Sequence, residues 1–358
     1  MYDRATLSFT LNKGGLSLTA STALQRSQLD GQRNDESPLE RKYTRLLPSL
    51  SVRFNNSNGS SLRFSYDTNL QEPSIEQLQP VVDNSDPLSI YIGNPDLQPS
   101  YRHDLSVNYN LFDQFSSTSL FASAYLTFTQ NPIVNATRVN EFFVRTIEPV
   151  NTDESVSLYS NLYFSTPLRK LGVNLNVNLF PSFRRNTLFV NDTENRSTTL
   201  QQSIRVTINN LKTDFIEARI GGSFTFNKTT YSVSTELNRT YNNQNLNVSL
   251  TLTPTEKWSF NSRFSHTWYP GTSFSQSDRI ALWDISLSRS FTPSNRLLLR
   301  LSAKDLLNQN LSIQRSATLN YLFEERVRSL GRHVMLTLTY KISGFGNDDS
   351  GSVLIIED

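Results

Sequence analysis

With 358 residues, the chain is long enough to form a large core or one big barrel. Its formal net charge of only +2, with arginines scattered instead of clustered, argues against a nucleic-acid partner, and the absence of cysteine excludes disulfides and thiolate metal sites. Charged residues make up 18% and aromatic residues 11% of the chain, a balance unlike that of most water-soluble domains.

Runs of alternating apolar and polar residues follow one another along almost the whole sequence. A period of two is the pattern of a strand with one apolar face. Strands are predicted around residues 5–11, 16–24, 50–54, 62–70, 105–111, 120–128, 156–164, 173–179, 200–208, 216–226, 246–252, 258–264, 283–287, 297–301 and 334–340. No stretch shows capped helical periodicity over three turns, so the chain is predicted to be all-β.

The connections between these runs differ systematically in length. Short turns, as at 12–15 and 254–257, contrast with polar segments such as 25–40, 71–99 and 132–148. Outer-membrane barrels join their strands in this way, whereas sandwiches have shorter strands and no such asymmetry. We therefore predict an antiparallel transmembrane β-barrel, integral to the Gram-negative outer membrane. A secreted sandwich, a β-helix, an adhesin and an envelope enzyme are the alternatives.

The predicted barrel covers residues 1–342, and a polar C-terminal tail covers 343–358. The first residues lack the basic and apolar regions of a signal peptide. In addition, an even strand count is expected of a complete single-chain barrel, and counting back from the last strand leaves the strand at 5–11 without a partner. These two features predict that the sequence is the C-terminal portion of a longer barrel.

Several segments resemble the TonB-dependent outer-membrane receptors, and most closely the outer-membrane β-barrel family abundant in Bacteroidota. They are residues 64–80, the run Asp-Asn-Ser-Asp-Pro-Leu at 83–88 and the loop Gly-Asn-Pro-Asp-Leu-Gln-Pro at 93–99, with shorter matches at 149–153, 235–239, 305–310 and 333–341. The resemblance implies a 22-stranded barrel, of which about fifteen strands are present. The tail after residue 342 departs from the pattern, because many relatives stop at an aromatic residue.

The resemblance also implies a function and a set of partners. The function is TonB-dependent uptake of a scarce solute, such as a metal chelate, a glycan or a peptide, with no enzymatic activity and no cofactor. The partners are outer-membrane lipid, the receptor's own plug domain and the TonB complex, which is reached through an N-terminal region absent from this sequence. A surface lipoprotein is a further candidate partner. The alternative is a passive or structural barrel without TonB-driven transport.

The loop that carries the resemblance is interpreted as a rigid turn, with substrate contact or a hinge as the alternative. Its members are Gly93, Asn94, Pro95, Asp96, Leu97, Gln98 and Pro99. In this interpretation the side chains of Asn94 and Asp96 bond to local backbone, while Pro95 and Pro99 fix φ.

Arginines recur at polar positions of the strands, where they would face the lumen. They are Arg53, Arg63, Arg205, Arg219, Arg263 and Arg300. They could form a track for an anionic solute. The favoured interpretation is that they pair with carboxylates such as Asp67 and Glu217, or with groups of the plug.

Aromatic residues near the strand ends are expected to form girdles at the two membrane interfaces, with a ligand cage as the alternative. They are Trp258, Trp268, Trp283, Phe291 and Tyr340. His103, His266 and His333 lack metal-ligand spacing. The run 305–310 is interpreted as a strand-to-loop transition, because no nucleophile or base accompanies its carboxylate. No catalytic site is predicted.

Overall fold

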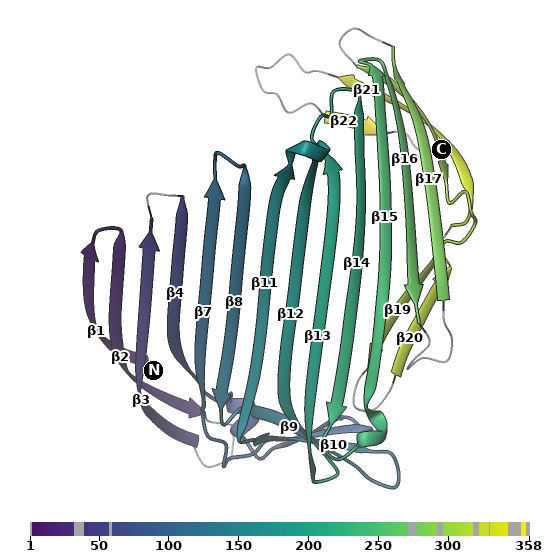
Figure 1. Cartoon of the computed structure of the whole chain (residues 1–358). Helices are drawn as coiled ribbons and strands as arrows, with labels where there is room; N and C mark the ends of the chain where they lie inside the picture. The colour runs from purple at the N-terminus through teal and green to yellow at the C-terminus, as the bar shows by residue number, and fades with distance from the viewer. Residues whose placement is uncertain are drawn as a thin grey trace. The chain divides into compact units, whose positions relative to one another are not determined.

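The computed structural model describes residues 2–31, 39–56, 59–270, 278–291, 296–317, 322–328, 330–342 and 352–355. These residues form one sheet of 20 strands and a separate sheet of two strands, β19 and β20 (Figure 1). By its internal contacts the chain divides into two units, which are described separately. The first comprises Met1–Tyr163, Leu179–Gln202 and Asn227–Arg239, and the second Phe164–Asn178, Ser203–Phe226 and Thr240–Asp358.

The first unit contains the N-terminal strands and the long insertions between them. Its long strands are β1 (Tyr2–Lys13), β2 (Leu16–Gly31), β3 (Leu39–Asn55), β4 (Ser60–Gln71), β7 (Ser100–Asp113) and β8 (Thr118–Gln130), which run side by side in Figure 1. Its insertions contain α1 (Ile75–Leu78), β5 (Val82–Asp86), β6 (Ser89–Ile92), β9 (Ile133–Val139) and β10 (Arg145–Asn151). Each neighbouring pair of these long strands is antiparallel.

Five strands contribute residues to both units, and the C-terminal strands belong to the second. The five are β11 (Glu154–Leu168), β12 (Val173–Val190), β13 (Thr193–Asn210), β14 (Ile216–Tyr231) and β15 (Arg239–Thr255). The others are β16 (Trp258–Tyr269), β17 (Asp278–Ser290), β18 (Leu297–Lys304), β19 (Leu311–Ala317), β20 (Leu322–Arg328), β21 (His333–Ile342) and β22 (Ser352–Ile355). Single 3-10 turns occur at Arg169–Leu171 and Thr235–Leu237.

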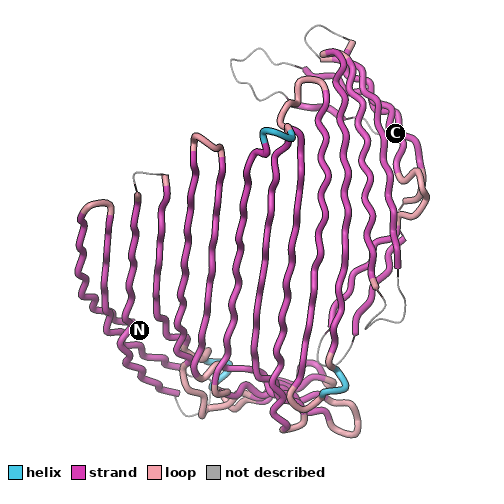
Figure 2. The backbone as a smooth tube through the Cα atoms, in the orientation of Figure 1, coloured by secondary structure: helices cyan, strands magenta, loops and turns pink. Residues whose placement is uncertain are grey.

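All fifteen predicted strands are present, which confirms the all-β, antiparallel prediction (Figure 2). The predicted polar loop at 25–40 is wrong at both ends, because β2 continues to Gly31 and β3 starts at Leu39. Gln25 and Ser27 are only 6% and 3% exposed there, and the Ser27 hydroxyl donates to Glu72. Backbone pairing and these buried polar contacts sustain the strands without apolar alternation.

Cross-strand neighbours divide the strands into an apolar and a polar face. In the first unit, Leu7, Phe9 and Leu11 of β1 are all exposed, and they pair with Thr22, Ala20 and Leu18 of β2. Partners directly opposite each other lie on the same face of a sheet. An exposed apolar face of this kind fits a hydrocarbon environment.

On the polar face, hydroxyl groups of neighbouring strands form hydrogen bonds with each other. Ser8 donates to Ser21 over 2.9 Å, and the hydroxyls of Ser65 and Ser106 are 2.6 Å apart. In the second unit, Ser203 and Thr225 are joined over 3.0 Å in the same way. At these positions the face is polar without being charged.

The short turns have the geometry that their residues predict. Gly14 and Gly15 connect β1 to β2 with φ values of 56° and 83°. Residues with side chains rarely adopt such angles, so the pair of glycines suits a two-residue hairpin. A Cβ on Gly15 would lie 2.4 Å from the carbonyl oxygen of Asn55.

Within the described part of the chain, no helix is long and apolar enough to cross a membrane. The tail was predicted to be polar and outside the barrel, but Ser352–Ile355 form β22, which pairs with the last four residues of β21. The remainder of the tail lies outside the described residues.

Candidate functional site

Two long insertions of the first unit pack together into one structure, which we call the loop platform (residues 71–99 and 131–151). β5 pairs with β6, β6 runs parallel to β10, and β10 is antiparallel to β9. The end of β12 continues this arrangement by pairing with β9 in parallel. The long polar segments predicted at 71–99 and 132–148 are therefore folded structures in their own right.

The platform contains a one-turn helix that the sequence predictions missed. Ser74 caps α1 by accepting the backbone N–H of Gln77, whose side chain in turn accepts the backbone N–H of Ser74. This reciprocal pair is a capping box, and the pattern Ser-x-x-Gln was visible in the sequence as a signal for it. A helix of four residues has no apolar periodicity, which is why the predictions did not include it.

The loop 93–99 is held by hydrogen bonds to both insertions. The Asn94 backbone N–H donates to the carbonyl oxygen of Gln77 over 2.6 Å. The Asn94 side-chain amide donates to the carbonyl oxygen of Pro149 over 3.1 Å. The Asn94 side-chain oxygen accepts the backbone N–H of Asp96 over 2.9 Å. Asn94 thus forms the predicted bond to local backbone, while Asp96 participates through its N–H.

Close packing fixes the rest of this loop. Leu97 is 2% exposed and Leu78 of α1 is fully buried. A Cβ on Gly93 would lie 2.0 Å from the carbonyl oxygen of Gln79, so no larger residue fits. Gln98 and Asn151 exchange two hydrogen bonds of 2.8 and 2.9 Å, and the Arg41 guanidinium donates to the carbonyl oxygen of Pro95 over 3.0 Å. These contacts are those of a packed turn.

The tip of the β9–β10 hairpin presents apolar side chains at its surface. Phe142 and Phe143 are 73% and 83% exposed. The side-chain oxygen of Asn140 holds their turn by accepting the backbone N–H groups of Phe142 and Val144, each over 3.0 Å. This tip is therefore an exposed apolar surface held in a defined turn.

One ion pair attaches the same hairpin to the β12–β13 turn, and a second joins its own two strands. Arg138 donates to Asp192 over 2.5 Å and to Glu148 over 2.8 Å. The hydrogen bonds that Arg138 donates to Asp192 and, to a lesser extent, to Glu148 raise the pKa of Arg138 above its ordinary value. The Asn191 side chain accepts the backbone N–H of Val139 over 2.8 Å. The platform is therefore tied to a neighbouring strand pair as well as to its own strands.

In the second unit, three cationic side chains surround one carboxylate on the polar face of β16, β17 and β18. We call this hollow of about 260 Å³ the polar pocket. Its charged and polar lining consists of Ser259, Asn261, Arg263, Asp284, Ser286, Ser288, Arg300 and Lys304. Three positive charges against one negative charge favour an anionic ligand.

Within the polar pocket, the Asp284 carboxylate has more hydrogen-bond partners than the arginine side chains have. Lys304 pairs with Asp284 over 2.9 Å, and the backbone N–H of Asp305 donates to the same carboxylate over 2.9 Å. Arg263 is the cross-strand partner of Asp284. Arg300 donates through Nε to Ser288 over 3.1 Å, which uses one of its five donors.

In the polar pocket the structure brings together two of the predicted lumen arginines, Arg263 and Arg300. Arg219 forms a long ion pair of 3.6 Å with Glu217, as the pairing interpretation expected, and Arg205 lies on β13 outside the polar pocket. Arg63 belongs to the first unit, where its cross-strand partners are Arg53 and Asn108. Asp67 pairs in register with Asp104 instead of with an arginine.

Sequence reasoning did not select Asp284 and Lys304. Asp284 is a charged residue at a polar position of the predicted strand 283–287, and Lys304 lies three residues after the predicted strand 297–301. Their proximity depends on the register between β17 and β18, which the sequence does not specify. The adjoining Asp305 is the first residue after β18 and begins the predicted strand-to-loop transition: it is 3% exposed and accepts the backbone N–H groups of Gln309 and Asn310.

None of the predicted histidines and aromatic residues is among those that line the polar pocket. Among the described residues, no group of three or more acidic or histidine side chains is arranged to hold a metal ion. The ring of His103 stacks with that of Tyr66, and a 2.9 Å hydrogen bond joins His103 Nδ1 to the Tyr66 hydroxyl. Trp258 and Trp268 stand at opposite ends of β16, and Trp283 is the cross-strand partner of Phe264 between them.

Solved structures that resemble this chain were found at low sequence identity. The ferric-catecholate import receptor Fiu from E. coli K12 (open form) is 11% identical, with 95% of this chain and 66% of that chain covered and a TM-score of 0.42. The siderophore receptor PiuA from Acinetobacter baumannii is 12% identical, with 96% and 60% covered and a TM-score of 0.41. BauA, the ferric preacinetobactin receptor from the same organism, is 12% identical, with 99% and 60% covered and a TM-score of 0.42.

The present chain thus spans between 60% and 66% of the length of these three receptors. Among curated protein sequences, none matches it significantly. The model of the outer membrane protein beta-barrel family matches residues 7–340, which is nearly the whole chain. This protein therefore belongs to the outer membrane protein beta-barrel family and is integral to the outer membrane.

Proposed function

We propose that the chain is the barrel portion of a TonB-dependent receptor, of the type abundant in Bacteroidota, that imports a scarce solute. The residues at 64–80, 83–88 and 93–99, which resemble those receptors, support the proposal. The observation that carries it furthest is the polar pocket, in which Arg263, Arg300 and Lys304 surround a single carboxylate. The proposed role is binding and transport, without catalysis.

Among the three expected solute classes, the polar pocket favours an anionic metal chelate over a neutral glycan. Arginine presents a fixed fork of donors that matches carboxylate-like oxygen pairs, and each charge-assisted hydrogen bond is worth about 1.5–3 kcal/mol. Asp284 already has Lys304 and the Asp305 N–H as partners, so it competes less for the two arginines. A peptide with a free carboxylate would satisfy the same chemistry.

The proposal also assigns partners by the resemblance. A plug domain would contact the polar face, and TonB would act on that plug. The exposed Phe142 and Phe143 offer an apolar surface that a surface lipoprotein could cover. These partners belong to the proposal for the whole receptor.

The test is uptake by cells of the native host that express the whole gene, with and without a protonophore. Radiolabelled ferric chelates with a net negative charge serve as probes. We expect saturable uptake that stops when the protonophore is added. Replacing both arginines, Arg263→Gln with Arg300→Gln, should raise the half-saturation concentration about tenfold or more, because two charge-assisted contacts are lost.

The matched control is Arg205→Gln, which removes an arginine from β13 outside the polar pocket and should leave uptake unchanged. Uptake that is insensitive to the protonophore and does not saturate would instead identify a passive barrel. If energised uptake persists with unchanged half-saturation in the double variant, the receptor role stands but the polar pocket is not its solute site.

A further inference from the structure

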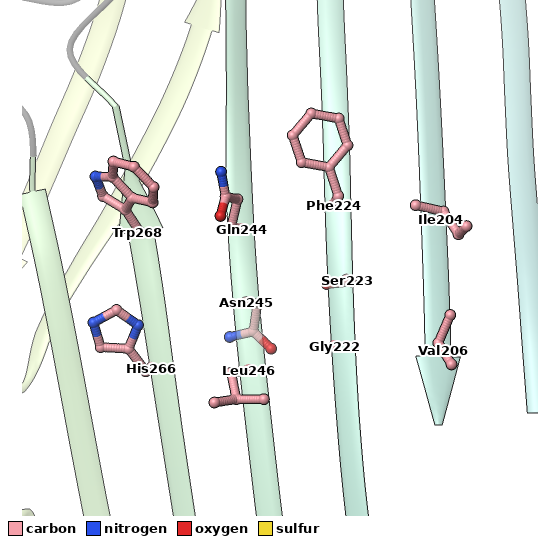
Figure 3. A pocket seen from close by; sticks show the side chains of 10 residues that line it. All are labelled: Ile204, Val206, Gly222, Ser223, Phe224, Gln244, Asn245, Leu246, His266 and Trp268. Carbon is pink, nitrogen blue, oxygen red and sulfur yellow. The ribbon is translucent and has the colours of Figure 1, made fainter. Parts of the chain in front are cut away.

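A hollow of about 420 Å³ lies on the apolar face of the second unit, across β13, β14, β15 and β16. Figure 3 shows Ile204, Phe224, Leu246 and Trp268 around it, with Gly222 contributing no side chain to its floor. A Cβ on Gly222 would have its nearest neighbour at 3.9 Å, the carbonyl oxygen of Asn245, so the space above this residue is open. We call this hollow the Gly222 groove.

A positive charge stands at one end of the Gly222 groove. Arg279 is the cross-strand partner of Trp268, and its guanidinium carbon lies 5.2 Å from the centroid of the Trp268 ring. Gln244, opposite Trp268 on the other side, brings an amide to the same level of the sheet. A mostly apolar trough, whose lining also includes the His266 ring opposite Leu246, thus ends in a guanidinium and an amide donor.

A second arginine–tryptophan pair on the same strand indicates where the Arg279–Trp268 pair lies along the membrane normal. At the other end of β16, Arg289 lies over the Trp258 ring at 5.0 Å and is its cross-strand partner. Ten residue steps separate Trp258 from Trp268, which corresponds to about 33 Å along a strand and, at a tilt of about 40°, to the apolar band of about 25 Å in outer-membrane barrels. The two pairs therefore mark the two membrane interfaces.

The loop lengths identify which interface Trp268 occupies. β15 joins β16 by a short turn beside Trp258, whereas residues 270–277 connect the Trp268 end of β16 to β17. Short turns face the periplasm and longer loops face outward in this class of barrel. Trp268 and Arg279 consequently stand at the level of the outer-leaflet headgroups.

We propose that the Gly222 groove binds one phosphorylated lipid of the outer leaflet. An acyl chain occupies the hollow over Gly222, the phosphate accepts hydrogen bonds from Arg279, and the Gln244 amide lies within the region of the ester carbonyls. The apolar lining favours hydrocarbon, and the guanidinium distinguishes an exposed phosphate from a shielded one. The inference follows from the apolar face alone and does not depend on solute uptake.

The chain contains three tryptophans, which makes fluorescence quenching by brominated lipids a site-resolved test. Trp258→Phe with Trp283→Phe leaves Trp268 as the reporter in the full chain, reconstituted in phosphatidylcholine vesicles. Tail-brominated phosphatidic acid is then compared with phosphatidylcholine brominated at the same positions. We expect about fivefold stronger association of phosphatidic acid beside Trp268, the effect of one arginine at a membrane surface. Arg279→Gln should remove this preference, and Arg279→Lys should retain part of it.

Trp283, retained alone by Trp258→Phe with Trp268→Phe, is the matched control because it lies between the two interfaces. It should show no headgroup preference. Gly222→Leu should reduce quenching of Trp268 by filling the groove, and folding of each variant is checked by heat-modifiable electrophoretic mobility. Equal quenching of Trp268 by both lipids, or a preference that survives in Arg279→Gln, would overturn the proposal.

Discussion

Gly93→Ala is expected to disrupt the loop platform and to destabilise the protein by about 3 kcal/mol or more, because overpacking that forces backbone to move lies at the upper end of such costs. The added Cβ would meet the carbonyl oxygens of Gln79 at 2.0 Å and Glu76 at 2.7 Å, and neither is the flexible end of a side chain. The loop must then leave α1, which exposes Leu97 and breaks the hydrogen bond between Asn94 and Gln77.

Hydrogen exchange measured by mass spectrometry would follow this change directly. Amides in 71–99 and 145–151 should exchange much faster in the variant, while those of β1 and β2 should keep their protection. Gly222→Ala is the control for the loss of a glycine, since its Cβ meets no atom closer than 3.9 Å. Unchanged protection across 71–99 in Gly93→Ala would contradict the packed-turn description of this loop.

Val248→Arg is expected to destabilise the barrel in a bilayer by about 2–4 kcal/mol, the cost of an arginine on the lipid side near the midplane. Val248 pairs with Phe264, which pairs with Trp283, so it belongs to the apolar face halfway between the two interfaces. The guanidinium would have to remain in hydrocarbon or distort the surrounding lipid.

The adjacent substitution Asn247→Arg supplies the matched control, because Asn247 pairs with Ser265 on the polar face. It introduces the same side chain one residue away and should change stability by less than about 1 kcal/mol. Denaturant titration in phospholipid vesicles, followed by fluorescence, compares the two. Similar destabilisation by both variants would show that the assignment of the two faces is wrong.

The strands were predictable because alternate residues of a barrel strand face lipid and lumen, so apolar and polar residues alternate along the sequence. The run Leu-Ser-Phe-Thr-Leu at 7–11 is an example: its apolar positions share one face of the sheet with Thr22, Ala20 and Leu18 of β2. Gly14 and Gly15 likewise predicted the hairpin, because few other residues adopt the positive φ values of this turn. In β2 the alternation ends after Leu24 although the strand continues to Gly31, so the prediction stopped too early.

The loop platform and the polar pocket were harder to predict, for different reasons. The platform depends on tertiary hydrogen bonds between insertions about 55 residues apart in sequence, such as that from Asn94 to Pro149. The polar pocket depends on register: a shift of one residue between β17 and β18 would turn Lys304 or Asp284 to the opposite face. Arg263 and Arg300 were recognised as candidates, but nothing in the sequence separated them from Arg63 or Arg205.

The hydroxyl pairs on the polar face have a consequence for membrane insertion. Between residues 5–12 of β1 and their partners 17–24 of β2, there is no ionisable side chain, and Ser8 with Ser21 and Thr10 with Thr19 satisfy each other's hydroxyls. A charged side chain costs about 2.5–3.5 kcal/mol at the centre of a bilayer during insertion. This hairpin can therefore enter hydrocarbon with both of its faces uncharged, before any neighbouring strand has formed a lumen to shelter it.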